Sequence, residues 1–183
     1  HLGEDNSGYY VEDVYCARQY RNGGAVGRIG PMQIPNANTL NCEHTWPQSR
    51  FNGSKSKEMQ KSDLHHLYPT NSRMNSRRGN YRFAETDHGR TLECAQNKLG
   101  AAMRPTIIEE IVGNNHHSGT FFEPPRAHKG NVARAIFYFS VRYHMDISFT
   151  EEHYLRKWHD QDPVDDFEMR RNRLIMEAQG SRN

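Results

Sequence analysis

The stretch LNCEHTWPQSRFNGSKSKEMQKSDLHHLYPTNSRMNSRRGNYRF, from Leu40 to Phe83, concentrates chemically reactive side chains. An adjacent Glu43–His44 pair stands near its start, followed by two adjacent histidines and, over the whole stretch, five asparagines. Apolar core segments do not have this composition. A disordered tail does not have it either, because large apolar residues and prolines recur along it: Trp46, Pro47, Leu64, Leu67, Tyr68 and Pro69. The stretch therefore predicts a folded, polar site.

Two short strands followed by a helix are predicted within this stretch. The strands are expected at 39–45 and at 64–68. The second should end at the proline that follows it, since proline cannot donate to a β-ladder. Thr70 or Asn71 is suited to cap the helix, which should run through Asn75 to the next glycine.

Outside this stretch, the chain is predicted to be mostly helical. Residues 23–35 are expected to form a loop, and residues 84–125 are expected to be rich in loops, with one helix after Pro105. The segment VARAIFYFSVRYHM, capped by Asn131, is apolar nearly all round and should be the core helix. Further helices are expected at 9–20, from Thr150, and from about Pro163 to Ala178. No repeat or linker divides the sequence. The expected fold is a single α+β domain over residues 1–183, mostly helical with a small antiparallel β element.

Length and composition predict a polar protein with a folded core. The 183 residues are enough to bury a sizeable core, hydrophobic residues make up 34%, and the mean hydropathy is −0.99. No stretch approaches the roughly 20 consecutive apolar residues of a membrane span. Because the chain begins at His1 instead of Met, we expect a mature or trimmed product. Cys16, Cys42 and Cys94 form no CxxC pair, which argues against a zinc ribbon and allows at most one disulfide.

Positive charge is concentrated between Arg50 and Arg82. Eight Lys or Arg face two acids there, a net charge of +6 in a chain whose total is +2. A basic field inside a nearly neutral protein is typical of a surface that binds polyanions, and a solvated basic loop is the alternative. The residues predicted to bind nucleic acid are Arg50, Lys55, Lys57, Arg73, Arg77, Arg78 and Arg82.

Glu43, His44 and Asn75 are the side chains best suited to a reaction. A carboxylate, an amide oxygen and water form a sparse oxygen site of the kind that suits Mg²⁺. An imidazole with a reference pKa of about 6.5 is a natural base at neutral pH. Adjacent residues of a regular strand point to opposite faces. For Glu43 and His44 to line one site, the chain should therefore leave strand geometry here, which the nearby Pro47 favours.

Four segments closely resemble the bacterial endonuclease I family: NCEHTWPQS, DLHHLYPTNSRMNSRRGNY, FEPPRAHKGNVARAIFYFSVRY and MEAQGSRN. The resemblance covers residues 9–183 in order. Members of this family are non-specific nucleases with a ββα-metal (His-Me) finger, which would span about 39–80 here. The resemblance implies a monomeric, periplasmic or secreted enzyme that needs Mg²⁺, with Mn²⁺ or Ca²⁺ able to occupy the same site. It also implies cleavage of double- and single-stranded DNA, with RNA as a second substrate, to 5′-phosphate and 3′-hydroxyl ends.

The same resemblance suggests a role for each candidate residue. His44 corresponds to the general base, Glu43 to one metal ligand and Asn75 to the other, with Asn71 and Asn80 as competing choices for the second ligand. An arginine is expected to stabilise the phosphate during the reaction, and the sequence leaves the choice open among Arg50, Arg73, Arg77 and Arg78.

Several other readings remain open at this point. A protein of the same fold that binds nucleic acid without cutting it would share the basic residues, and a zinc-binding structural module would use the histidines. Cys42 and His44 share a strand face, which invites a cysteine-nucleophile interpretation. The pair His65–His66 is expected to orient or support the finger, and Arg134 to satisfy a carboxylate.

Overall fold

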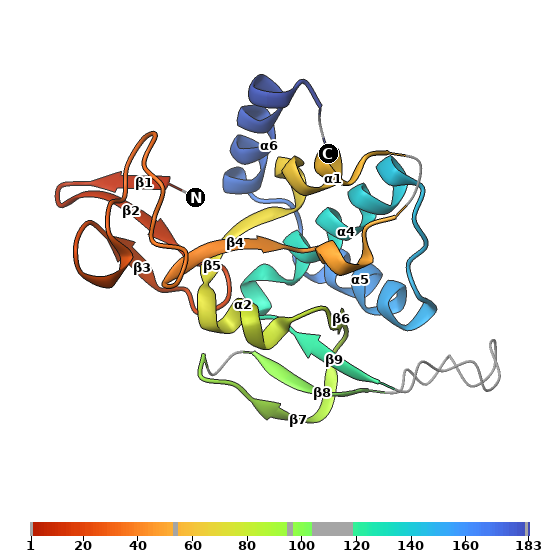
Figure 1. The fold of residues 1–183 in the computed structure, drawn as a ribbon. Helices are drawn as coiled ribbons and strands as arrows, with labels where there is room; N and C mark the ends of the chain where they lie inside the picture. The colour runs from red at the N-terminus through yellow and green to blue at the C-terminus, as the bar shows by residue number, and fades with distance from the viewer. Residues whose placement is uncertain (1, 53–54, 95–96, 104–118, 182) are drawn as a thin grey trace.

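An antiparallel pair of strands, β4 (Leu40–His44) and β5 (Leu67–Asn71), runs through the middle of the computed structural model (Figure 1). The structure describes residues 2–52, 55–94, 97–103, 119–181 and 183. Helix α2 (Ser72–Arg78) follows β5 directly. The predicted order of strand, strand and helix is therefore found, but the second strand begins three residues later than predicted, because Leu64–His66 forms a 3-10 turn.

The proline of β5 does not end the strand, contrary to the prediction. Pro69 pairs with Cys42 in the middle of the ladder. The Cys42 carbonyl points away from β5, because it accepts a hydrogen bond from α2. Backbone groups at this position of an antiparallel ladder face outward on both strands, and on the outer side Val14 donates its N–H to the Pro69 carbonyl. The missing N–H of proline therefore costs no ladder hydrogen bond.

A three-stranded antiparallel sheet precedes the central pair. It consists of β1 (Leu2–Asp5), β2 (Gly8–Glu12) and β3 (Gln19–Arg21). The helix predicted at 9–20 is therefore wrong. The Asp13 carboxylate accepts hydrogen bonds from the N–H groups of the turn that follows β2, which offers the backbone an alternative to a helix.

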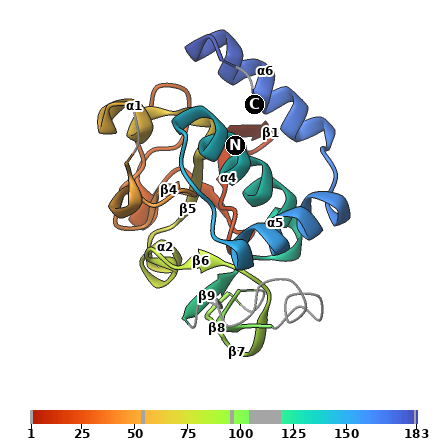
Figure 2. The ribbon, with the colours of Figure 1, turned by 90° about the vertical axis from the view of Figure 1, so that its right-hand side faces the viewer.

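A four-stranded sheet lies below the central pair in the views of Figures 1 and 2, on the side opposite the C-terminal helix. Its order is β6 (Arg82–Phe83), β9 (Thr120–Glu123), β8 (Lys98–Ala102) and β7 (Thr86–Thr91). The expectation that residues 84–125 are rich in loops is wrong for the segments that form β7, β8 and β9. The helix predicted after Pro105 lies outside the described residues.

Helix α4 (Lys129–Tyr143) is the core helix that the sequence predicts. Phe139 is fully buried, and its ring stacks on Trp46 and Phe51, with ring centroids 5.2 and 5.7 Å away. The predicted Asn131 cap is wrong, because the helix begins two residues earlier, at Lys129. The core thus supports the segment that follows β4 directly.

The remaining helices surround this core. Short α1 (Lys57–Ser62) lies between the two central strands in sequence, and α5 (Phe149–Gln161) packs against α4. Helix α6 (Asp166–Gln179) begins three residues after the predicted start, with Asp165 as its cap. Within the described parts of the chain, no helix has both the length and the apolar character needed to cross a membrane. The mixed α+β class is confirmed.

Candidate active site

Helix α2 covers the open edge of β4 with its own side chains. Asn75 donates its amide Nδ2 to the Cys42 carbonyl at 3.1 Å and to Asn41 Oδ1 at 2.9 Å. The Arg78 guanidinium donates to the carbonyls of His44 at 3.1 Å and Thr45 at 2.5 Å. The edge carbonyls of the strand are therefore satisfied, and α2 is held in fixed register with β4.

The two ends of α2 are determined by local sequence. Asn71 caps the helix by accepting from the Met74 N–H at 3.1 Å. Gly79 ends it with a φ of +56°, a positive value that glycine adopts without strain. Of the two predicted caps, Asn71 is the one found. As the cap, its side-chain oxygen already has a donor, which separates it from Asn75.

A pocket of about 450 Å³ lies where β4 meets α2. Glu43, His44 and Asn75 all line it, so the structure brings the three predicted site residues together. Strand β4 stays regular through His44, which pairs with Leu67. The expectation that the chain leaves strand geometry at this pair is therefore wrong. The other lining residues are Cys42, Pro47, Gln48, Ser49, Arg78, Gly79 and Asn80.

Glu43 is a buried carboxylate with one oxygen committed to the protein. Its Oε1 accepts a hydrogen bond from the Tyr15 hydroxyl at 2.8 Å and pairs with Arg78 at 3.2 Å. Among the described residues, no group donates to Oε2. Burial raises the pKa of Glu43 above its usual range, while Arg78 and Tyr15 act in the opposite direction. The carboxylate is thus held in place with an oxygen available to a cation.

His44 has a defined tautomer because of its hydrogen bonds. Its Nε2 lies 3.1 Å from the Lys61 carbonyl, which can only accept, so Nε2 carries the hydrogen. The lone pair of the neutral ring is then on Nδ1, which the Gln48 amide approaches at 3.3 Å. Burial lowers the pKa of His44 below its usual range, opposed by the hydrogen bond to Lys61. At neutral pH the ring is therefore a neutral base.

The residues of the pocket fit a Mg²⁺ site with few protein ligands. The Asn75 Nδ2 group is directed at two acceptors, which turns its Oδ1 the other way, and within the described chain nothing donates to that oxygen. Glu43 Oε2 supplies a second oxygen. The described residues contain no group of three or more His, Cys, Asp or Glu that could hold a metal ion. Water would have to complete the coordination, as Mg²⁺ commonly allows.

The predicted arginines lie in different surroundings. Arg78 is 1% exposed, whereas a contact with phosphate on the basic surface requires an exposed guanidinium. Arg50 and Arg82 both pair with the buried Glu151, at 3.5 and 2.9 Å, and line a separate pocket. Arg73 is exposed and pairs with Glu93 at 2.8 Å.

The other predicted basic residues, Arg77, Lys55 and Lys57, are exposed. Arg78 is the one predicted arginine that lines the Glu43–His44 pocket. The phosphate-stabilising roles of Arg50, Arg73 and Arg77 therefore stay predictions.

The histidine pair and Arg134 have the structural surroundings that the sequence predicts. His65 and His66 are buried, and the His66 ring lies 5.4 Å from the His44 ring, centroid to centroid. His66 Nε2 is 2.7 Å from the Gln60 carbonyl. Arg134 pairs with Glu168 through two hydrogen bonds of 2.6 and 2.5 Å. His66 thus packs against the His44 ring, and neither His65 nor His66 lines the Glu43–His44 pocket.

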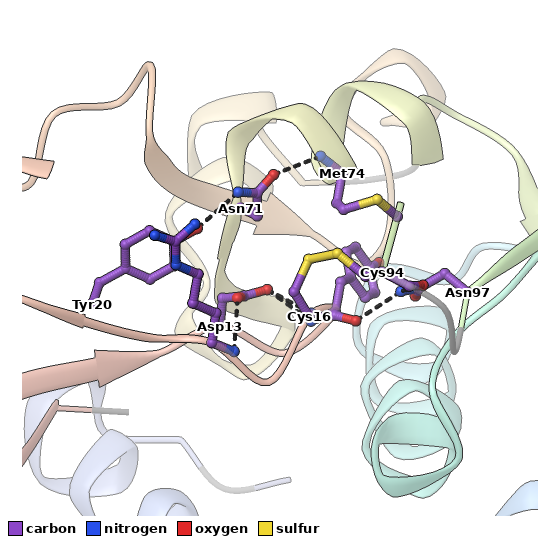
Figure 3. Close-up of a disulfide and its surroundings, with 9 residues drawn as sticks. Asp13, Cys16, Tyr20, Asn71, Met74, Cys94 and Asn97 are labelled. Carbon is purple, nitrogen blue, oxygen red and sulfur yellow. Dashed lines mark hydrogen bonds between the residues drawn. A yellow bond between two sulfur atoms is a disulfide. The ribbon is translucent and has the colours of Figure 1, made fainter. Parts of the chain in front are cut away.

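A disulfide joins Cys94 to Cys16, the residue that follows Tyr15 (Figure 3). Cys42 is free and exposed, in line with the predicted maximum of one disulfide. Asn97 donates to the Tyr15 carbonyl at 2.7 Å. The disulfide and this hydrogen bond hold Tyr15, whose hydroxyl contacts Glu43.

Sequence reasoning missed Tyr15 and Gln48, and it assigned Arg78 to the wrong environment. Tyr15 is far from the motif in sequence, and no local pattern indicates its contact with Glu43. Gln48 and Arg78 lie within the motif, so a model of the ββα unit with side chains would have found both.

A comparison with known proteins decides the family. The sequence profile of the Endonuclease I family matches residues 4–183. The chain belongs to this family. The family predicted from the four motifs is therefore confirmed.

Individual relatives include enzymes named for RNA and for DNA. An extracellular ribonuclease of Bacillus subtilis (strain 168) is 33% identical over 180 residues, covering 88% of this chain and 52% of that protein. A periplasmic deoxyribonuclease of Aeromonas hydrophila is 29% identical over 175 residues, covering 87% of this chain and 68% of that protein. An extracellular deoxyribonuclease of the same organism is 26% identical over 175 residues. The chain spans about half the length of the Bacillus ribonucleases that it matches.

Proposed function

We propose that this chain is a metal-dependent endonuclease that hydrolyses phosphodiester bonds of DNA or RNA without base specificity. The observation that carries the proposal is that Glu43, His44 and Asn75 line one pocket in a member of the Endonuclease I family. A protein that merely binds nucleic acid would not need a neutral imidazole held with its lone pair on one defined nitrogen.

His44 is the general base of this reaction. The Lys61 carbonyl holds the ring through Nε2–H, so Nδ1 is the atom that accepts a proton from water. That water attacks phosphorus, the bond to the 3′ oxygen breaks, and the products are a 5′-phosphate and a 3′-hydroxyl. The lowered pKa of His44 keeps the ring neutral and ready to accept the proton at pH 7.

Glu43 and Asn75 are the proposed protein ligands of Mg²⁺, through Oε2 and Oδ1. A bound Mg²⁺ would offset the negative charge that develops on the phosphate. Arg78 and Tyr15 orient the Glu43 carboxylate from the protein side. Residues that orient a ligand in this way commonly matter nearly as much as the ligand itself.

The substrate is proposed to bind through its sugar–phosphate backbone. Exposed Lys55, Lys57, Arg73 and Arg77 offer positive charge to phosphates, and backbone contacts carry no base information. The names of the relatives, which include ribonucleases and deoxyribonucleases, support both nucleic acids as candidates. Those relatives are named extracellular or periplasmic, and disulfides persist in oxidising compartments. We therefore place the enzyme outside the cytoplasm.

Nicking of a supercoiled plasmid tests the proposal. The wild type should convert the plasmid to open-circular and linear forms with Mg²⁺ and should stop when EDTA is in excess. His44→Ala should retain binding to the plasmid but not cleave it, whereas His153→Ala on α5 serves as the matched control and should cleave normally. Wild-type cleavage that survives EDTA would contradict the role of the metal. Binding without cleavage by the wild type would favour the inactive nucleic-acid-binding protein.

A further inference from the structure

Gln48 is an exposed side chain directed at the base nitrogen of His44. It begins the short 3-10 turn Gln48–Arg50 that follows β4. Its Nε2 lies 3.3 Å from His44 Nδ1. Because Nε2 of His44 is committed to Lys61, Nδ1 is the ring nitrogen that a reacting water must reach. The Gln48 amide therefore occupies the approach to the reactive lone pair.

The backbone of Gln48 is more firmly held than its side chain. Pro47 precedes it with a φ of −67°, and the Pro47 carbonyl accepts from the Arg50 N–H at 2.9 Å. The Gln48 carbonyl accepts from the Phe51 N–H at 3.1 Å. Trp46, just upstream, is 2% exposed and stacks on Phe139. The amide is thus carried by a hydrogen-bonded turn, and it contacts His44 Nδ1.

The chemistry of an amide suits this position. A primary amide both donates and accepts, and rotation about its last bond exchanges the two roles. In the structure, the N–H side of the amide faces the lone pair on His44 Nδ1. With a water between them, the amide oxygen can accept one proton of that water while Nδ1 accepts the other.

We propose that Gln48 is a further catalytic residue, which holds the attacking water against His44 Nδ1. The inference rests on the proposed nuclease function. In the step, one O–H bond of the water breaks and its proton moves to Nδ1. The water oxygen forms a bond to phosphorus, the bond from phosphorus to the 3′ oxygen breaks, and the departing oxygen takes a proton from solvent. Gln48 itself is unchanged by the reaction. Its amide oxygen accepts a hydrogen bond from the second proton of the water, and this contact directs the lone pair of the water oxygen at phosphorus.

Two substitutions separate this role from simple support of the ring. Gln48→Ala removes the amide and opens space, whereas Gln48→Met keeps the length of the side chain without its polar atoms. Both should lower the single-turnover cleavage rate by about tenfold, the loss of one hydrogen bond to the reacting water, with DNA affinity within about twofold of wild type. Gln19→Ala and Gln19→Met, on the exposed side of β3, are the matched controls and should cleave as the wild type does.

The choice of nucleophile gives a readout that a structural role would not change. In buffer with methanol, the fraction of new ends that carry a 5′-methyl phosphate ester reports competition between methanol and water. Water has a second O–H group that Gln48 can bind, whereas methanol has a methyl group in its place. Gln48→Ala removes this preference for water and makes room for the methyl group, so it should raise the fraction severalfold. A slower reaction with an unchanged fraction would overturn the proposal, as would wild-type rates in both variants.

A spectroscopic measurement separates failure of this inference from failure of the proposed function. Nitrogen-15 spectra of free wild type and Gln48→Met report the hydrogen bond at His44 Nδ1 without any cleavage. The Nδ1 shift should change in Gln48→Met and stay the same in Gln19→Met. An unchanged Nδ1 shift in Gln48→Met overturns the contact. Failure of the wild type to cleave, with the contact intact, overturns the nuclease function and this role with it.

Discussion

Two groups of residues build the active site: one comes from a single continuous segment, and the other comes from distant parts of the chain. The first is the ββα segment, 40–78, which supplies the base, both proposed metal ligands and the Arg78 guanidinium. The second is a support from outside this segment, in which the turn 13–18 and residues 94 and 97 hold Tyr15 against Glu43. Figure 3 shows part of this support, namely the disulfide, Asn97 and the turn that Asp13 caps.

The difference teaches which part of a site the sequence can reveal. Glu43 and His44 are neighbours, and Asn75 is on the helix that follows the second strand, so their meeting follows from local structure. Tyr15 reaches Glu43 across 28 positions of sequence, and Asn97 reaches Tyr15 across 82. No motif or periodicity encodes such contacts. We expect substitutions inside the ββα segment to affect catalysis most, and those in the support to affect mainly metal affinity.

Among the substitutions that affect the metal ligands and their support, the largest effect is expected for Glu43→Gln, within the ββα segment. Loss of the charged ligand should reduce cleavage by at least about 100-fold. It also leaves the buried Arg78 without its charged partner, so the free energy of unfolding should fall by about 3 kcal/mol. Turnover and urea unfolding measure the two effects, with Glu4→Gln, exposed on β1, as control. Normal cleavage by Glu43→Gln would contradict the proposed role of Glu43 as a metal ligand.

A smaller effect is expected for Tyr15→Phe, in the outer support. The substitution deletes one hydroxyl that donates to Glu43 Oε1 and leaves the ring in place. Because partners of metal ligands typically contribute 10- to 100-fold, Mg²⁺ affinity should fall by about tenfold. Titration calorimetry measures the change, and Tyr9→Phe is the matched control. Wild-type Mg²⁺ affinity in Tyr15→Phe would contradict the claim that the outer support contributes to metal binding.

The pH dependence of cleavage probes the protonation of His44 and of the buried Glu43 carboxylate. Burial lowers the pKa of His44 from its usual value of 6.5, so the neutral, reactive form predominates at pH 7. The rate should stay level as pH falls to about 6.5 and then drop by about tenfold per unit below the lowered pKa. Single-turnover rates between about pH 4.5 and about pH 8 measure this decline. A rate that already declines above pH 7 would contradict a depressed pKa.

The smallest effect is expected for Asn71→Ala at the start of α2. The cap that Asn71 provides to the Met74 N–H would be lost, together with its 2.7 Å hydrogen bond to the Tyr20 hydroxyl (Figure 3). The free energy of unfolding should fall by about 1 kcal/mol, while Mg²⁺ affinity stays the same. Asn38→Ala, on an exposed loop, is the control. Weaker Mg²⁺ binding in Asn71→Ala would show that the helix ligand is not Asn75.

The fold was predictable where local sequence determines it. The two central strands, α2 with its cap, and the core helix α4 follow from nearby residues. The N-terminal sheet was not, because Tyr9–Tyr20 has helical spacing of its apolar residues, and the pairing with β1 and the Asp13 turn decides against a helix. The four-stranded sheet was missed for a similar reason, since β9 pairs with β6 and β8 from distant parts of the chain.

The surroundings of the arginines were not predictable from the local sequence either. Charge counting placed Arg78 on the nucleic-acid surface, but the position of Arg78 on α2 turns it toward the edge carbonyls of β4, where it is buried. A count of charges carries no information about which face of a helix is covered.

The most direct test of the account is titration calorimetry of Mg²⁺ binding to the wild type, His44→Ala and Asn75→Ala. It asks whether the metal ligands and the general base are separate residues. The wild type and His44→Ala should bind Mg²⁺ with similar affinity, because His44 Nε2 is committed to Lys61 and its Nδ1 serves as the base. Asn75→Ala should bind it at least about tenfold more weakly. Equal binding by Asn75→Ala, or loss of binding in His44→Ala, would contradict the separation of metal ligands from base.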